Sequence, residues 1–253
     1  MREEWITSRK NPLLVQIRRL VSSRGARRSA GMFLGDGVKL LEEALKWGAP
    51  LETVVYSEGL DGPELPPEVR TVRVPEDVMA SISPMESPQG ALFLCRMWDT
   101  APPPRLEGGR YLVLDGLQDP GNVGTIWRTA DALEADGLLL VHGCADPFGP
   151  KVVRATMGAC FRLPVWETGP ERLADLLERS GLALYATALR EDTEDIKTAD
   201  LSRSAVVIGS EGRGVSPELL AMSQRALKIP MRERCESLNA AAAAAVVLWE
   251  MGR

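Results

Sequence analysis

Three loops of this 253-residue chain concentrate glycines and polar residues that could bind a ligand and act on it. The first carries Asn122 and Arg128, and in the second Glu211 stands among three glycines. The third carries Ser237 and Asn239 just before a run of alanines. Glycines let a ligand approach the backbone closely, and amide, carboxylate and guanidinium groups can orient a substrate or stabilise a developing charge. A site is therefore sought in these loops.

Each loop also has a purely structural interpretation. Asn122 could cap the helix that follows it, leaving Arg128 on the surface, and Ser237 could cap the last helix. Ser216-Pro217 is typical of an ordinary helix start. The glycine-rich loop could cradle a phosphate, but it matches neither GxGxxG nor a P-loop with its Lys-Ser/Thr ending. The alanine run favours a helix that packs closely against another element.

Strands alternate with helices in the part of the chain that contains these loops. This alternation predicts an α/β domain whose sheet is mostly parallel and covered on both faces. Ligands bind such sheets beyond the carboxyl ends of the strands, where the three loops lie. The expected strands are 111–114, 137–141, 163–166, 183–187, 205–208 and 226–229, and the expected helices are 123–134, 151–157, 171–180, 217–222 and 238–251.

A second, smaller α/β domain is expected before a proline-rich linker. Three consecutive prolines, flanked by polar residues and glycine, place that linker at 99–109. We therefore predict a first domain over 1–98 and a second over 110–253. In the first, the pattern predicts helices at 13–21, 38–47 and 76–82 and strands at 32–34, 53–56, 69–74 and 91–97.

Charge is distributed unevenly along the chain. The 30 basic and 35 acidic residues give a net charge of −5, which alone argues against a protein that coats nucleic acid. Residues 1–31 nevertheless hold eight basic and two acidic residues, a net +6 that leaves −11 for the rest. This basic N-terminal arm is either a solvated tail or a contact for phosphates.

Composition also indicates where the protein is located and whether its cysteines form disulfides or bind a metal. No apolar run approaches the roughly 18 residues of a membrane span, and the first residues lack the apolar core of a secretory signal. We expect a cytoplasmic protein that does not bind membranes. The four cysteines are far apart and none forms a CxxC pair, so neither a disulfide framework nor a metal site is indicated.

Taken together, the three loops resemble the signature motifs of the SpoU family, also called the TrmH family, of RNA ribose 2′-O-methyltransferases. The matching residues are Asn122, Gly124 and Arg128 in the first motif, Gly209, Glu211, Gly212 and Gly214 in the second, and Ile229, Pro230, Met231, Glu236, Ser237, Leu238 and Asn239 in the third. Residues 151–165 resemble the segment between motifs, and Ser87-Pro88-Gln89-Gly90 resembles a lead-in in the first domain. The resemblance spans nearly the whole chain.

The chain departs from the family pattern at a few positions. Ser210 replaces a frequent Asn, Asp36 replaces a frequent Glu, and Trp249 replaces an aromatic residue that is often Tyr. Arg232-Glu233-Arg234 replaces residues that are often small. Of these departures, only Ser210 is expected to affect the hydrogen bonding around the site.

The resemblance implies a fold, a cofactor and partners. It implies a trefoil knot in the second domain, an L30e-like RNA-binding first domain, and a homodimer whose active site uses both subunits. It also implies S-adenosylmethionine as cofactor, bound largely by main-chain groups at Gly209, Ile229 and Leu238, with Thr187 nearby. The basic arm would then contact RNA, with ribosomal RNA preferred by analogy.

The resemblance further implies attack of a ribose 2′-oxygen on the methyl group of the cofactor. We expect Arg128 to orient the ribose-phosphate and stabilise the oxyanion, because an arginine is a poor free base. The alternative that stays open is that Arg128 removes the proton of the hydroxyl. Asn122 and Asn239 would position Arg128 and the target nucleotide. Glu211 would hold Arg128 or the ribose by a charge-assisted hydrogen bond, and Ser237 would fix the loop or the target.

The only histidine, His142, is expected to be a strand-end or loop residue, with no apparent His-Asp pairing. Three alternatives to a ribosomal RNA methyltransferase stay open. One is a transfer RNA 2′-O-methyltransferase. Another is a catalytically silent RNA-binding or ribosome-assembly protein, which would be expected to have broken motifs. The third is a nucleotide-dependent enzyme, which the lack of a phosphate-binding Lys after the glycine-rich loop disfavours.

Overall fold

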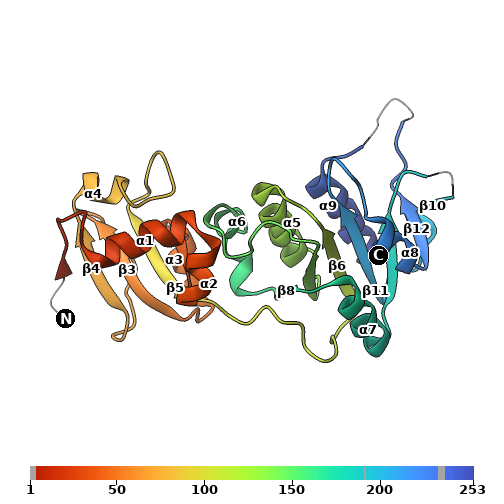
Figure 1. The fold of residues 1–253 in the computed structure, drawn as a ribbon, viewed down its shortest axis with the longest axis horizontal. Helices are drawn as coiled ribbons and strands as arrows, with labels where there is room; N and C mark the ends of the chain where they lie inside the picture. The colour runs from red at the N-terminus through yellow and green to blue at the C-terminus, as the bar shows by residue number, and fades with distance from the viewer. Residues whose placement is uncertain (1–3, 191, 233–236) are drawn as a thin grey trace. The chain divides into compact units, whose positions relative to one another are not determined.

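The structure, a computed structural model, describes residues 4–190, 192–232 and 237–253 (Figure 1). The chain forms two compact units. The first contains the residues up to Trp98 together with Asp146–Phe161, and the second contains Asp99–Ala145 and Arg162–Arg253. The predicted end of the first domain at residue 98 coincides with a change of unit. The sequence prediction had placed residues 146–161 in the second domain, whereas in the structure they pack within the first unit.

The second unit is built on a seven-stranded sheet in which all neighbouring strands run parallel, as the alternating pattern predicted. Parallel strands place their carboxyl ends at the same edge, so the three loops come together there. In spatial order the strands are β10 (Glu194–Asp195), β12 (Arg225–Lys228), β9 (Ala183–Thr187), β11 (Ser204–Gly209), β6 (Arg110–Asp115), β7 (Gly137–Val141) and β8 (Val165–Glu167).

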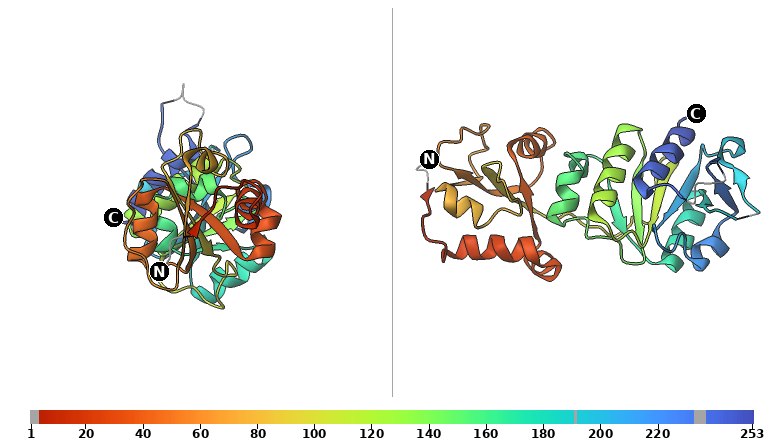
Figure 2. Two further views of the ribbon diagram at one scale, coloured as in Figure 1. Left: turned by 90° about the vertical axis from the view of Figure 1, so that its left-hand side faces the viewer. Right: turned by 90° about the horizontal axis from the view of Figure 1, so that it is seen from above.

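Helices cover both faces of this sheet. Helices α5 (Pro120–Ala132) and α9 (Ala240–Met251) lie on one face, and α7 (Pro170–Ser180) and α8 (Pro217–Met222) lie on the other (Figure 2). Helix α7 packs against the sheet because its leucines at 173, 176 and 177 form one apolar side, which is buried. These leucines join buried residues of the central strands in a common core.

The caps of α5 and α9 differ from the sequence prediction. The carboxylate of Asp119 accepts a hydrogen bond from the backbone N–H of Asn122 at 2.7 Å, so α5 begins at Pro120 and Asn122 lies inside it. Asn239, not Ser237, caps α9 by accepting from the N–H groups of the second and third helical residues. A proline suits the first turn because its missing N–H is not needed there. The alternative interpretation of Asn122 and Ser237 as helix caps is therefore wrong, which leaves both side chains available for other contacts.

The first unit contains a five-stranded mixed sheet with helices on both sides (Figure 2). The strands, in spatial order, are β1 (Glu4–Trp5), β4 (Arg70–Val74), β3 (Leu51–Ser57), β5 (Ala91–Arg96) and β2 (Met32–Asp36). The helices are α1 (Pro12–Ser22), α2 (Arg24–Ala30), α3 (Val38–Lys46), α4 (Glu76–Ala80) and α6 (Pro150–Ala155). Sequence analysis missed β1 and α2, and in the second unit it missed β10.

Most of the basic N-terminal arm is folded rather than a tail. Helix α1 buries Leu13, Leu14, Ile17 and Leu20, while α2 is capped by Ser23 and ends at Gly31 in the left-handed conformation. Periodicity did not reveal α2 because its seven residues carry three arginines and no large apolar side chain. Capping residues at both ends were the signal that was overlooked.

Residues 146–161 are held in the first unit by a buried ion pair and aromatic contacts. The guanidinium of Arg27 donates to the carboxylate of Asp146 at 2.7 and 2.9 Å, and both side chains are less than a tenth exposed. Nearby, the ring of Phe148 packs against Phe33 and Trp98 with centroids 5.2 and 4.8 Å apart. The buried ion pair and the packed aromatic rings attach this segment to the first unit.

The described helices include none long and apolar enough to cross a membrane.

We predict that Asp146→Ala destabilises the first unit by about 3 kcal/mol or more, because it leaves the Arg27 guanidinium buried without its carboxylate partner. Urea unfolding measures the loss. Asp77→Ala is the matched control, since it removes the carboxylate of the exposed Arg9–Asp77 pair and should cost less than about 1 kcal/mol. Equal losses in the two variants would show that the buried pair does not hold the segment.

Candidate active site

A pocket opens at the carboxyl ends of β9, β11 and β12, next to the start of α9. It has a volume of about 220 Å³ and a mostly apolar lining. Its wall includes all four residues expected at the cofactor, Thr187, Gly209, Ile229 and Leu238, and two of those expected at the reaction, Glu211 and Ser237. Three separate loops and the last helix thus contribute to one cavity.

The glycine-rich loop folds back on itself beside this pocket. Ser210 and Gly214 exchange backbone hydrogen bonds of 2.8 and 3.1 Å, which closes the loop. A Cβ atom on Gly209 would lie 2.1 Å from the backbone carbon of Gly214, so only glycine fits there. Gly214 itself has a φ of +68°, in the left-handed region that glycine tolerates. The close approach of the two backbone segments shapes this wall of the pocket.

A chain of hydrogen bonds connects the three motif loops. The side-chain amide of Asn122 donates to the carboxylate of Glu211, and its oxygen accepts from the amide of Asn239 at 3.1 Å. Asn239 uses its own side-chain oxygen to cap α9. The structure therefore brings Asn122, Glu211 and Asn239 together.

Of the other predicted catalytic residues, Ser237 lines the pocket without joining this chain of bonds, and Arg128 does neither. It lies six residues after Asn122 on α5, about 9 Å further along the helix axis, and its side chain is exposed. Among the residues that the structure describes, none forms a hydrogen bond or ion pair with Arg128. Glu211 accepts its hydrogen bond from Asn122 and not from Arg128.

Two further predicted site residues, Thr187 and Ser237, also lie at the pocket. The hydroxyl of Thr187 donates to the carbonyl of Val207 at 2.8 Å, which ties the end of β9 to β11 beside the pocket. Ser237 is exposed at the pocket wall. Glu236, which the third motif also includes, lies outside the described residues.

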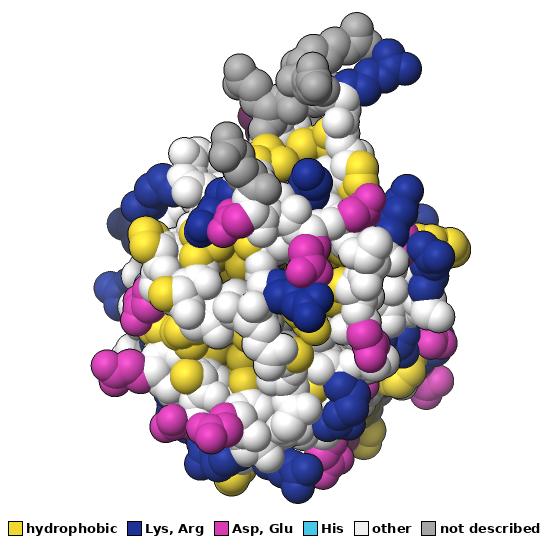
Figure 3. Space-filling view, turned by 90° about the vertical axis from the view of Figure 1, so that its right-hand side faces the viewer, with side chains coloured by type: hydrophobic (Ala, Val, Ile, Leu, Met, Phe, Trp, Pro, Cys, Tyr) yellow, Lys and Arg dark blue, Asp and Glu magenta, His cyan; other side chains and the backbone are white. Residues whose placement is uncertain are grey.

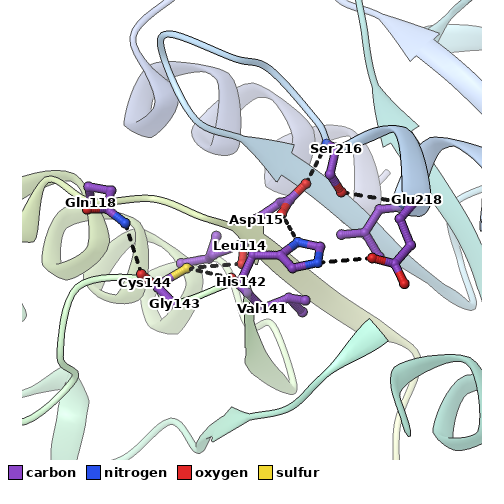
Figure 4. Close-up of polar contacts among 10 residues, drawn as sticks. Leu114, Asp115, Gln118, Val141, His142, Gly143, Cys144, Ser216 and Glu218 are labelled. Carbon is purple, nitrogen blue, oxygen red and sulfur yellow. Dashed lines mark hydrogen bonds and ion pairs between the residues drawn. The ribbon is translucent and has the colours of Figure 1, made fainter. Parts of the chain in front are cut away.

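His142 forms the pairing that sequence analysis did not find (Figure 4). Its Nδ1 lies 2.6 Å from the carboxylate of Asp115, and its Nε2 lies 3.2 Å from the carboxylate of Glu218. The hydrogen bond with Asp115, together with both nearby negative charges, raises the pKa of His142 above its usual value. Asp115 is the last residue of β6, and His142 directly follows β7, the neighbouring parallel strand. Their common place at the carboxyl ends of adjacent strands was the signal in the sequence.

Charged side chains of both signs are interspersed around apolar patches on the face of the second unit shown in Figure 3. The apolar side chains at the pocket mouth include Leu189 and Leu238, which are 57% and 39% exposed. Such exposure of large apolar side chains beside a concave site is typical of a surface that receives a ligand or partner.

This arrangement suits a ligand that is partly apolar and carries a positive charge. Ile208, Leu227 and Ile229 offer an apolar slot, while Gly209 leaves backbone groups open to close approach. Among the described residues of the pocket wall, Glu211 is the acidic one. The adenosine and sulfonium groups of S-adenosylmethionine match this combination of apolar slot and carboxylate.

The comparison with known families decides the enzyme class. Residues 109–249 match the family model described as the SpoU rRNA Methylase family, which is more than half of the chain. Residues 11–92 match a model described as an MRM3-like substrate binding domain.

The chain belongs to the SpoU rRNA methylase family.

Membership confirms the resemblance found in the motifs, and with it the predicted S-adenosylmethionine-dependent RNA methyltransferase.

Individual relatives match along nearly the whole chain. The 23S rRNA (guanosine(2553)-2′-O)-methyltransferase RlmP of Bacillus subtilis is 33% identical, covering 97% of this chain and 98% of its own. An uncharacterized tRNA/rRNA methyltransferase of Synechocystis sp. is 37% identical, covering 98% and 93%. The crystal structure of an AdoMet-bound rRNA methyltransferase from Sinorhizobium meliloti superposes with a TM-score of 0.86 at 30% identity, covering 98% and 97%.

We predict that Gly209→Ala weakens the binding of S-adenosylmethionine by at least about tenfold, or about 1.4 kcal/mol. The added Cβ would collide with the backbone at Gly214 and push the glycine-rich loop out of place. Isothermal titration calorimetry measures the dissociation constant. Gly212→Ala is the control in the same loop, because a Cβ there meets nothing within 4 Å. Unchanged binding by Gly209→Ala would show that the cofactor does not bind against the glycine-rich loop.

Proposed function

We propose that this methyltransferase transfers a methyl group from S-adenosylmethionine to a ribose 2′-hydroxyl of ribosomal RNA, at the pocket beside the glycine-rich loop. The observation that carries the proposal is that the second and third motif loops line one cavity, and that Asn122 of the first motif bonds to both of them through Glu211 and Asn239. Relatives that match nearly the whole chain, such as the Bacillus subtilis enzyme, are named as 23S rRNA 2′-O-methyltransferases.

S-adenosylmethionine supplies an activated methyl group on a sulfonium, and the residues of this chain bind and orient the two reactants. Gly209, Ile229 and Leu238 provide the wall for the adenosine end, with Thr187 holding the end of β9 in place. The carboxylate of Glu211 favours a positive charge at the mouth of the pocket. Asn122 fixes the direction of that carboxylate through its amide.

The ribose hydroxyl must become a nucleophile without help from a histidine at the pocket, because His142 is engaged with Asp115 and Glu218. We assign to Arg128 the orientation of the ribose-phosphate and the stabilisation of the developing oxyanion. Its exposed guanidinium is free of partners among the described residues and can therefore reach RNA. Ser237 and Asn239, at the start of α9, are assigned to the target side of the pocket.

A homodimer would complete the site, and α9 is its proposed interface. This helix is apolar on nearly all sides, yet Trp249 on it is 64% exposed. Beside it, Ala132 and Leu133 at the end of α5 line the same shallow surface. A second copy that covers this surface would lie near Arg128, which is also on α5.

We assign RNA binding to the first unit, whose match is to a substrate binding domain. The exposed basic side chains on or next to α1 and α2, where a phosphate backbone can approach, are Lys10, Arg19, Arg24 and Arg28. Arg27 is not available, because it is buried against Asp146. An L30e-like fold for this unit is proposed on the same match.

A trefoil knot in the second unit is likewise proposed. After β12 the chain contributes Ile229, Met231 and then Leu238 to the pocket at the ends of β9 and β11. It then forms α9, which packs against both α5 and β11. This return of the chain from the edge strand to the middle of the sheet supports the proposed knot. A cytoplasmic location is proposed because ribosomal RNA is the substrate.

The assignment is tested by mapping 2′-O-methylated nucleotides in ribosomal and transfer RNA from cells with and without the gene. We expect one ribosomal RNA nucleotide to lose its methyl group when the gene is absent. Loss from transfer RNA instead would overturn the ribosomal target and favour the alternative substrate.

Arg128→Ala should lower kcat/KM for methyl transfer by about 100-fold to 1000-fold, because it removes a cation that stabilises the oxyanion. Binding of S-adenosylmethionine should stay unchanged, since Arg128 does not line the pocket. A methyl-transfer assay with purified RNA, alongside calorimetry, measures both. Arg179→Ala removes an exposed arginine of α7 as a control. Retained turnover in Arg128→Ala would refute its role.

Trp249→Glu should convert the protein from dimer to monomer, because it places a charge at the centre of the proposed interface. Analytical ultracentrifugation measures the mass. Trp47→Glu is the matched control, because Trp47 is 49% exposed in the first unit and outside the proposed interface. A dimer that persists in Trp249→Glu would place the interface elsewhere.

A further inference from the structure

His142 lies at the base of the glycine-rich loop, outside the pocket. The carboxylate of Asp115 is almost fully buried and binds two groups, the imidazole Nδ1 of His142 at 2.6 Å and the backbone N–H of Ser216 at 2.6 Å (Figure 4). Ser216 is the N-cap of α8 and immediately follows the loop that returns from Gly214. Asp115 therefore connects the end of β7 to the exit of the loop.

A second contact of His142 reaches the same short helix. Its Nε2 lies 3.2 Å from the carboxylate of Glu218, in the first turn of α8. Both carboxylates thus converge on one imidazole, from β6 on one side and from α8 on the other. A protonated imidazole donates to both, whereas a neutral one can donate to only one of them.

The entrance and the exit of the loop are fixed at the same level of the sheet. Gly209, where the loop leaves β11, is paired in register with Asp115 on β6. The segment from Gly209 to Gly214 forms a wall of the pocket, and a Cβ on Gly209 would collide with Gly214. A small movement at Ser216 would therefore change the space beside Gly209.

We propose that His142 is a positioning residue for cofactor binding, which acts through Asp115 and Glu218 to hold the exit of the glycine-rich loop against the sheet. The inference rests on the proposed assignment of the pocket to S-adenosylmethionine. His142 does not touch the pocket, so it acts on the cofactor only through the loop.

The proposal makes cofactor affinity depend on the protonation of His142. The facing charged groups are Asp115 from β6 and Glu218 from α8, and the hydrogen bond with Asp115 raises the pKa of His142. Cys144, which follows it on the same loop, stays neutral because burial raises the pKa of its thiol to about 11. A raised pKa means that the stabilising contacts are complete at low pH and are lost as the pH rises through the pKa of the folded state.

Direct electrostatics predicts the opposite direction. A protonated imidazole would repel the sulfonium, and affinity would then rise with pH. Under the proposal, protonation closes the network and affinity falls as the pH rises. The sign of the effect therefore separates positioning through the loop from simple charge repulsion.

The test uses the full-length protein without a histidine tag, in which His142 is the only histidine. Calorimetry with S-adenosylmethionine gives the dissociation constant from about pH 6 to about pH 9, across the range in which imidazoles titrate. Relative to His142→Gln, the unmodified protein should lose about fivefold or more in affinity over this range. The ammonium group of the cofactor titrates in both proteins and cancels in the comparison.

A reciprocal measurement uses the single imidazole signal in the NMR spectrum. If cofactor binding favours the protonated form, saturating S-adenosylmethionine must raise the pKa of His142 by the matching factor. Glu218→Gln should lower the pKa and reduce the coupling, and it tests the proposal even if His142→Gln fails to fold. Glu178→Gln, an exposed carboxylate on α7, is the control of equal charge.

The outcomes separate the inference from the function on which it rests. If the unmodified protein binds the cofactor but the pH dependence is the same in His142→Gln, or of opposite sign, the positioning role is overturned and the pocket assignment stands. If the unmodified protein does not bind S-adenosylmethionine at any pH, the pocket assignment fails and the inference fails with it.

Discussion

The site depends on one amide side chain, that of Asn122, which bonds to two loops at once. It donates to Glu211 on the glycine-rich loop and accepts from Asn239 at the start of the last helix. An Asn can do both because its amide has a donor and an acceptor end. Parallel strands bring the three loops to one edge of the sheet, and this bridge joins side chains of all three. The second and third of these loops line the pocket.

The architecture of the second unit could be predicted because its signal is local. Strands and helices alternate, and buried leucines on α7 recur at helical spacing. The order of the strands could not be predicted, since β12 pairs with β9 rather than with its neighbour in sequence, β11. The cap of α5 could not be predicted either, because Asp119 and Asn122 are both good capping residues. The backbone is extended at Asp119, which makes Asp119 the cap.

Contacts between residues far apart in sequence explain the remaining differences. Arg27 and Asp146 are 119 residues apart, so nothing local marks residues 146–161 as part of the first unit. The pairing of His142 with Asp115 was within reach, because each stands at the carboxyl end of a strand and the two strands are adjacent. The motif residues were recognised through the family pattern, whereas the bonds that join them required the structure.

The net negative charge of the chain no longer argues against RNA as a substrate once the charges of each unit are considered separately. Part of the positive charge of the N-terminal arm is structural, as the buried Arg27 shows, and part is exposed on α1 and α2. The acidic remainder includes Glu211 at the pocket, where a carboxylate suits a cationic cofactor. An acidic total is thus compatible with an enzyme that acts on RNA.

The central claim is that this pocket delivers a methyl group to a ribose oxygen. The most direct test incubates the purified protein with ribosomal RNA and S-adenosylmethionine carrying a deuterated methyl group, followed by digestion to nucleosides and mass spectrometry. The account predicts that the label appears on the 2′-oxygen of one nucleotide. Label on a base, or no transfer by protein that binds the cofactor, would contradict it.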